Sequence, residues 1–276
     1  EFRRVLFRSY IVTICLMAVV IALVSIQFAR LRKWVDELFH HYQKNVYLRH
    51  FSGALITGVI ALIVAFGLTL AANNGWMGIG DSEAKHALSL VLGTGETVID
   101  SALSGELLLS VAIIALIARI LAVLSTIGSG GSAGLLVPSL FFGTMVATVF
   151  FQVPQLLGWT LFEFPSYHLI IPAMVASLVA IVNVPLAAIL FVTEAFGGIW
   201  MVPAIITMIV ANIFAYNTSI YRTQREAYET RQILPGYSVY RLPVPPKWEN
   251  ETLASLHMGR TYSVNVIEIG RASCRE

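Results

Sequence analysis

Charged residues are scarce in this sequence. Asp, Glu, Lys and Arg make up 12% of its 276 residues, whereas a typical soluble domain carries about 25%. Hydrophobic residues account for 57%, and the mean hydropathy is +0.76. The formal net charge is only +2, and no basic stripe with interleaved aromatic residues is present, which argues against a nucleic-acid partner. This composition excludes most soluble classes and predicts an integral membrane protein.

Cysteine is nearly absent as well. Cys15 and Cys274 lie at opposite ends of the chain, so their spacing gives neither a disulfide framework nor a metal site. We therefore expect no metal and no cofactor.

Both ends of the chain differ in character from their neighbours. Residues 1–9 (EFRRVLFRS) and 269–276 (IGRASCRE) resemble translated adapter sequence, and no signal-peptide pattern is present. The alternative for the first segment is a genuine basic juxtamembrane arm. We expect both segments to be non-native and the chain to be part of a longer protein.

Apolar segments predict the transmembrane organisation. Three of them reach the roughly 20 residues that a helix needs to cross a bilayer: 10–28, 51–72 and 107–127. After Gly128 the apolar stretches are interrupted by Gly, Pro and Asn and are expected to be too short to span; they cover 135–153, 169–182, 186–200 and 201–216. The second and third of these meet at Asn183-Val184-Pro185, which predicts a re-entrant hairpin shielded from lipid by protein. The expected fold class is all-α: a polytopic membrane protein with tilted, broken and re-entrant helices.

Charge in the connecting segments predicts the orientation. Residues 30–49 carry an excess of Arg and Lys, whereas residues 81–106 are mainly acidic. The positive-inside rule then places the first segment in the cytoplasm and the second outside. The polar tail also falls inside, and its prolines predict a linker and the start of a truncated soluble regulatory domain over 222–268, with strand-like alternation at 237–242.

The segment 125–143, STIGSGGSAGLLVPSLFFG, is the richest in motif-like features. It lacks the Gly-Lys-Ser/Thr ending of a phosphate loop. Ser132 sits in a formal G-x-S-x-G match, but a long apolar helix precedes it where a nucleophile elbow needs a strand. A Gly-rich stretch that opens a helix leaves backbone N–H groups free, and with the helix dipole these groups offer an anion site. The alternative is a patch of small residues that lets helices pack closely.

Four segments resemble the CLC family of chloride channels and proton/chloride antiporters, in the family's order and at its spacing. GSGGSAGLLVPSLFFG at 128–143 resembles the GxFxP region, and Ala118-Arg119 resembles the Lys or Arg of the preceding helix. NVPLAAILFVTE at 183–194 resembles the R-x-P-L-T-x-I-x-x-V-x-E segment, and Ser219-Ile-Tyr221 resembles the element with the anion-coordinating tyrosine. The resemblance covers about residues 10–225 and implies the second inverted repeat of the membrane domain, which we place at 10–221.

The resemblance also implies the site residues. Gly134 matches the motif glycine, and the backbone N–H groups of Leu135 and Leu136 match those that face the central chloride. Tyr221 matches the tyrosine whose hydroxyl donates to the same ion, with Tyr216 as the competing choice. Two positions depart from the family pattern: Leu136 replaces the usual Phe, and Asn183 replaces the usual Arg.

The implied function is transport of chloride or a similar anion across a bacterial-type cell membrane by a homodimer. Channel and proton-coupled antiporter stay open, because the family's gating and proton glutamates belong to the first repeat. Arg119 is expected to have either a structural role, by pairing or by snorkelling toward the cytoplasmic side, or a direct role in attracting anions. Glu194 is expected to be a structural partner rather than a proton carrier. The alternatives are a cation-coupled secondary transporter of another broken-helix fold and a membrane hydrolase using Ser132.

Overall fold

The computed structural model describes residues 2–42, 45–80, 87–131, 134–159 and 164–215, together with short pieces of the tail (232–234, 237–238, 248, 252–258 and 264). The chain divides into two compact units, Glu1–Arg225 and Glu226–Glu276. The first unit holds all the long helices, and the two units are described separately.

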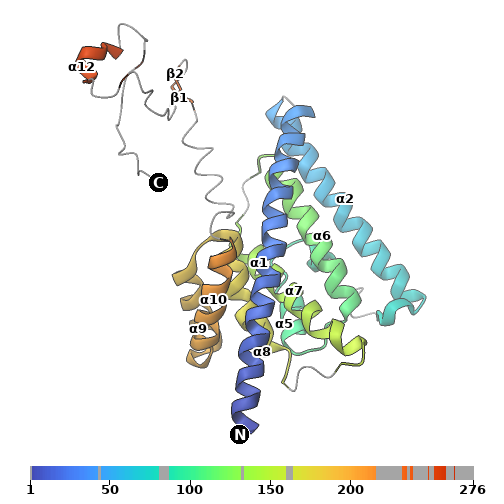
Figure 1. Cartoon of the computed structure of the whole chain (residues 1–276). Helices are drawn as coiled ribbons and strands as arrows, with labels where there is room; N and C mark the ends of the chain where they lie inside the picture. Colours follow the sequence, from blue (N-terminus) through green and yellow to red (C-terminus); the bar gives the residue numbers. More distant parts are fainter. Residues whose placement is uncertain are drawn as a thin grey trace. The chain divides into compact units, whose positions relative to one another are not determined.

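The first unit is built from helices alone in its described residues (Figure 1). Its first half contains α1 (Phe2–Tyr42), α2 (Val46–Asn73), the 3-10 turn η1 (Trp76–Gly78), α4 (Ala87–Val91), α5 (Glu96–Leu103) and α6 (Leu109–Gly128). Its second half contains α7 (Leu136–Leu156), α8 (Tyr167–Ser177), the π-helical turn η2 (Leu178–Val182), α9 (Pro185–Phe196), the 3-10 turn η3 (Gly198–Trp200) and α10 (Met201–Ala215).

Five stretches of the described chain are long and apolar enough to cross a membrane: Ser9–Tyr42, Val46–Asn73, Leu109–Gly128, Leu136–Leu156 and Gly198–Ala215. They confirm an all-α polytopic membrane protein. The expectation that every apolar piece after Gly128 is too short was wrong for two of them. Gly143 does not interrupt α7, because it is a packing glycine: a Cβ there would lie 2.4 Å from the Ser177 hydroxyl oxygen of α8.

Helix α1 also extends further than expected. The predicted span ended at Phe28, but the helix continues to Tyr42 through the basic segment that was expected to be a loop. No Gly or Pro interrupts it, and Val35 and Phe39 pack close to Gly128 at the end of α6. The extension therefore holds α1 against the start of the Gly-rich segment.

Helix α1 lies at the centre of the unit (Figure 1). It packs against α8 and α10 on one side and α6 on the other, while α2 covers α6 and α7 joins α6 to α8. Ile14, Met17 and Ile21 of α1 are fully buried in the resulting core. In contrast, α2 leaves large apolar side chains such as Leu62 and Phe66 about two-thirds exposed, at 67% and 68%. An apolar face of this kind on a long helix is explained by contact with lipid.

The expected hairpin is present between α8 and α9. The π-helical turn η2 ends at Asn183, whose φ of 61° and ψ of 50° are left-handed, and Pro185 begins α9. Asn is one of the few residues that tolerate this conformation, and Pro is well suited to the first position of a helix. The two helices on either side are apolar but shorter than a full span.

The second unit is described only in short pieces. β1 (Gln232–Leu234) pairs antiparallel with β2 (Tyr237–Ser238), and α12 (Leu253–Leu256) begins with a capping box at Thr252. β2 falls at the start of the segment expected to be a strand, and residues 239–242 lie outside the described residues. The regulatory-domain assignment stays a prediction.

Candidate functional site

The N-terminus of α7 is the centre of the candidate site. The helix begins at Leu136, with Leu135 as the N-cap residue and no side chain capping it. The Ser139 hydroxyl donates to the Leu135 carbonyl oxygen at 2.6 Å, so it is directed away from the first-turn amides. Among the described residues, the N–H groups of Leu135 and Leu136 have no acceptor. Within the described part of the chain, this helix end therefore presents donors without acceptors, together with the positive end of the helix dipole.

The glycines of this segment fall into two groups. A Cβ on Gly128 would lie 2.7 Å from a Val35 methyl carbon, and one on Gly131 would lie 2.8 Å from the Thr126 carbonyl oxygen. Close packing therefore explains these two glycines. Gly134 differs, because it is exposed and a Cβ there would meet nothing within 4 Å. Space beside Gly134 is open, as an ion approaching the backbone requires.

The structure describes only part of the predicted site. Gly134, Leu135 and Leu136 lie in sequence at the start of α7, with the Leu135 side chain buried and the Leu136 side chain 48% exposed. Tyr221 and its competitor Tyr216 lie outside the described residues, as does Ser132 of the hydrolase alternative. The amide half of the predicted site is thus described and the tyrosine half is not.

A small cavity lies beside the first turns of α7. Its volume is about 20 Å³, and it is lined by residues of α1, α6, α7 and η2, including Phe28, Arg119, Leu135, Ser139 and Ile181. A space of this size holds about one water-sized particle, since ~10–15 Å³ is the lower limit. Neither Gly134 nor Leu136 lines this cavity, so the cavity flanks the exposed start of α7.

Arg119 reaches this cavity from the middle of α6 and is only 6% exposed. Its guanidinium donates to the carbonyl oxygens of Val91 at 3.0 Å and Leu92 at 3.3 Å, and also to that of Gly93. It also lies over the Phe141 ring of α7, 4.8 Å from the ring centroid. Arg119 therefore makes structural contacts. Of the expected structural roles, the structure shows pairing, and the partners are backbone carbonyls.

These contacts reveal a feature that the sequence reasoning missed. Residues 73–106 were expected to be an outer loop, yet the end of α4 meets Arg119 halfway along a helix of full membrane length. Backbone can enter a membrane only where its polar groups are satisfied, and Arg119 satisfies three of these carbonyls. The sequence signal for this contact was a pair of glycines, Gly93 and Gly95, together with an Arg in an apolar helix that needed hydrogen-bond acceptors. In the structure both glycines have positive φ.

Two other ionisable residues play no part in the described site. Glu194 is exposed and makes no ion pair with a described residue. His168 lies at the start of α8, where it packs against the rings of Tyr10, Tyr167 and Trp200. Aromatic residues gathered at helix ends, such as Tyr167 and Trp200, are typical of interfacial anchoring.

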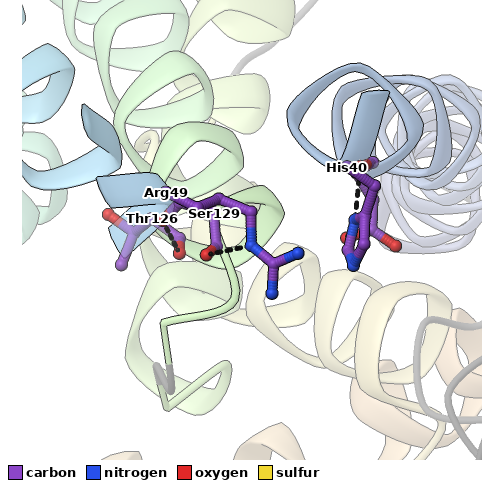
Figure 2. A network of polar contacts seen from close by, with 5 residues as sticks. His40, Arg49, Thr126 and Ser129 are labelled. Atoms are coloured by element: carbon purple, nitrogen blue, oxygen red, sulfur yellow. Dashed lines mark hydrogen bonds and ion pairs between the residues drawn. The ribbon is translucent and has the colours of Figure 1, made fainter. Parts of the chain in front are cut away.

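A polar network lies at the other end of the Gly-rich segment, where α6 stops (Figure 2). Arg49, near the start of α2, donates from Nε to the Ser129 carbonyl oxygen at 3.1 Å. The Ser129 hydroxyl donates in turn to the Thr126 carbonyl oxygen at 2.9 Å. Arg49 thus caps the C-terminal end of α6, where free carbonyls carry partial negative charge.

Comparison with known proteins agrees with this architecture. A model of the family described as voltage gated chloride channel matches residues 4–216. A search of curated proteins gave no match. The matched region contains every helix from α1 to α10, the Gly-rich segment and the hairpin at Asn183. Over most of its length, therefore, this chain belongs to the voltage gated chloride channel family.

Proposed function

We propose that this chain binds the transported anion at the N-terminus of α7, through the backbone N–H groups of Leu135 and Leu136. Transport of chloride or another anion across a membrane is the general function of its family. The members of that family are channels and transporters rather than enzymes. The proposal adds the residues that hold the ion.

The observation that carries the proposal is the uncapped start of α7 beside Gly134. Helix N-termini are usually capped by a Ser, Thr, Asp or Asn side chain, yet here no side chain of a described residue occupies the amides. The open space at Gly134 leaves a route for an ion to reach them. Packing alone explains Gly128 and Gly131, but it gives no reason for a glycine at position 134.

Backbone amides suit a transported ion. Each hydrogen bond to a charged partner contributes about 1.5–3 kcal/mol, and a helix N-terminus favours an anion without placing a full positive charge beside it. The ion exchanges part of its hydration shell for oriented dipoles, so binding is strong enough for entry and weak enough for release.

The remaining parts of the proposal rest on the resemblance to the CLC family. Tyr221 supplies a hydroxyl donor to the same anion, with Tyr216 as the alternative. The complete protein works as a homodimer, either as a channel or as a proton-coupled antiporter, and its tail lies in the cytoplasm. Residues 222–268 form a linker and the start of a soluble regulatory domain.

Amide-to-ester substitution tests the central claim. Replacing Leu136 by its α-hydroxy analogue in the complete protein removes one N–H group and keeps the side chain. Loss of one hydrogen bond to a charged partner, about 1.5–3 kcal/mol, corresponds to chloride binding weaker by about 10- to 100-fold. Calorimetric titration of the detergent-solubilised protein with chloride measures this change, and the Leu135 analogue is expected to behave alike.

The matched control is the α-hydroxy analogue of Val137, which lies in the same turn of α7 and is not expected to face the ion. This ester is expected to leave chloride affinity within about twofold. Equal affinities for the Leu136 ester and the natural protein would refute the proposed site. A loss of equal size at Val137 would show that the ester perturbs the helix and not the ion contact.

A further inference from the structure

The end of α6 that leads into the Gly-rich segment is brought very close to α2. A Cβ on Gly53 of α2 would lie 2.1 Å from the Ser129 hydroxyl oxygen, so only glycine fits there. One turn further along α2, the hydroxyl oxygens of Thr57 and Ser125 are 2.6 Å apart. This crossing fixes the register of the two helices and places Arg49, one turn before Gly53, over Ser129.

Arg49 is held there by one nitrogen only. Its Nε donates to the carbonyl oxygen of Ser129, a residue that is 2% exposed. Its two terminal nitrogens have no hydrogen-bond partner among the described residues, and Figure 2 shows the end of the guanidinium pointing away from α6. The side chain is half-buried, so the cation is oriented by the protein and still open to solvent.

Gly130 makes room for this arrangement. Its φ is +89°, and a Cβ there would lie 2.8 Å from a ring carbon of His50 and 3.2 Å from a terminal nitrogen of Arg49. The bare backbone of Gly130 therefore lets two basic side chains of α2 lie directly against the Gly-rich segment. His50 is exposed beside it.

The nearby acidic group is directed elsewhere. Asp36 of α1 lies with a carboxylate oxygen 3.4 Å from Nδ1 of His40, one turn along the same helix. No carboxylate of a described residue lies within ion-pair distance of Arg49. The charge of Arg49 is thus left uncompensated by the described part of the chain.

We propose that Arg49, with His50 beside it, forms a capture site for the transported anion at the mouth of the pathway, ahead of the α7 amides. Five residues separate Ser129 from Leu135, and the six steps of chain between them span at most about 20 Å. A cation fixed at the mouth of a low-dielectric pathway raises the local concentration of anions, in a way that depends on ionic strength. The inference rests on the proposed function, because the captured ion is the one that α7 binds.

Electrophysiology or stopped-flow flux on the complete protein in phosphatidylcholine vesicles tests this site. Arg49→Gln is expected to raise the chloride concentration for half-maximal flux by about 3- to 10-fold at low ionic strength, within the lower range of electrostatic focusing. The shift should appear only when chloride is varied on the membrane face that carries the α1–α2 connection. It should shrink in high concentrations of an impermeant salt.

Three variants separate charge from structure. Arg49→Lys keeps the charge and is expected to retain most of the wild-type behaviour, although it loses the fork geometry. His50→Glu changes an exposed side chain and should raise the half-maximal concentration without disturbing the cap on α6. The matched control is Lys33→Gln, which removes an exposed positive charge from α1 and should shift the value by less than about twofold.

Each other outcome has one meaning. A wild-type protein without anion flux would refute the proposed function itself. Wild-type flux with no shift in Arg49→Gln and His50→Glu would overturn the capture site alone. A shift equal on both faces and insensitive to salt would also overturn it, since that is the signature of altered packing. A shift seen only with phosphatidylglycerol present would assign the guanidinium to a lipid phosphate instead.

Discussion

Replacement of Arg119 by Leu is expected to release the membrane-depth segment at the end of α4. The substitution removes three donors and leaves the carbonyl oxygens of Val91, Leu92 and Gly93 without their partner. A buried carbonyl left without its donor costs about 1–3 kcal/mol, so the three together cost about 3 kcal/mol or more. Loss of the contact with the Phe141 ring adds about 1–2 kcal/mol, which is offset because the variant no longer buries a cation.

The perturbation should be greatest just after α4, because Leu92 and Gly93 lie outside the helix, whereas α4 itself also packs against α2 and α6 through Ala87, Leu90 and Val91. At the lower bound of about 3 kcal/mol, the opening equilibrium of this segment rises about 100-fold. Hydrogen–deuterium exchange of residues 87–95 in detergent micelles measures this directly. Arg119→Lys, which has donors but no fork, is expected to give an intermediate increase of about 10-fold.

Leu121→Ala is the matched control, since this side chain is on the same helix and 45% exposed. Its exchange in residues 87–95 should equal that of the natural protein. Unchanged exchange in Arg119→Leu would refute the reasoning, because it would mean that the three carbonyls have other partners or remain solvated. Uniformly faster exchange in every helix would also refute it, because the role would then be global stability.

Two further predictions concern backbone positions and are read from thermal unfolding in detergent. Gly143→Ala should destabilise the protein by about 1–3 kcal/mol, since a Cβ there would lie 2.6 Å from the Ala173 carbonyl oxygen. The control Gly67→Ala should not destabilise it, because a Cβ there would meet nothing within 4 Å. Equal effects of the two substitutions would contradict the packing argument. Asn183→Val should cost about 1–2 kcal/mol because of its left-handed φ of 61°, whereas Asn183→Gly should cost less; the reverse order would contradict the conformational explanation.

Asn183 also shows why one departure from the family pattern is compatible with the fold. The sequence comparison registers only a lost positive charge at the position before Val184-Pro185. In the structure, the Asn183 N–H donates to the carbonyl oxygens of Leu178 and Val179 and closes the π-helical turn. A left-handed residue is needed there, and Asn adopts that conformation more readily than most residues.

Most of the transmembrane helices were predictable because hydropathy and length are local properties of a segment. The helices near 51–72, 107–127 and 201–216 begin and end close to their expected limits. The errors at α1 and α7 have one cause: whether a charged stretch or a glycine ends a helix depends on what packs against it. Val35 and Phe39 hold the end of α1, and Ser177 fills the space at Gly143.

The sequence by itself determined the membrane class, the hairpin at Asn183-Val184-Pro185 and the Gly-rich start of α7, because each depends on neighbouring residues. Only the tertiary structure separated Gly134 from the packing glycines, gave Arg119 the carbonyls of α4 as partners and placed Arg49 against Ser129. The physical reason is the same in each case. A buried donor or a bare glycine is explained by the atoms opposite it, and in this fold those atoms come mainly from other helices.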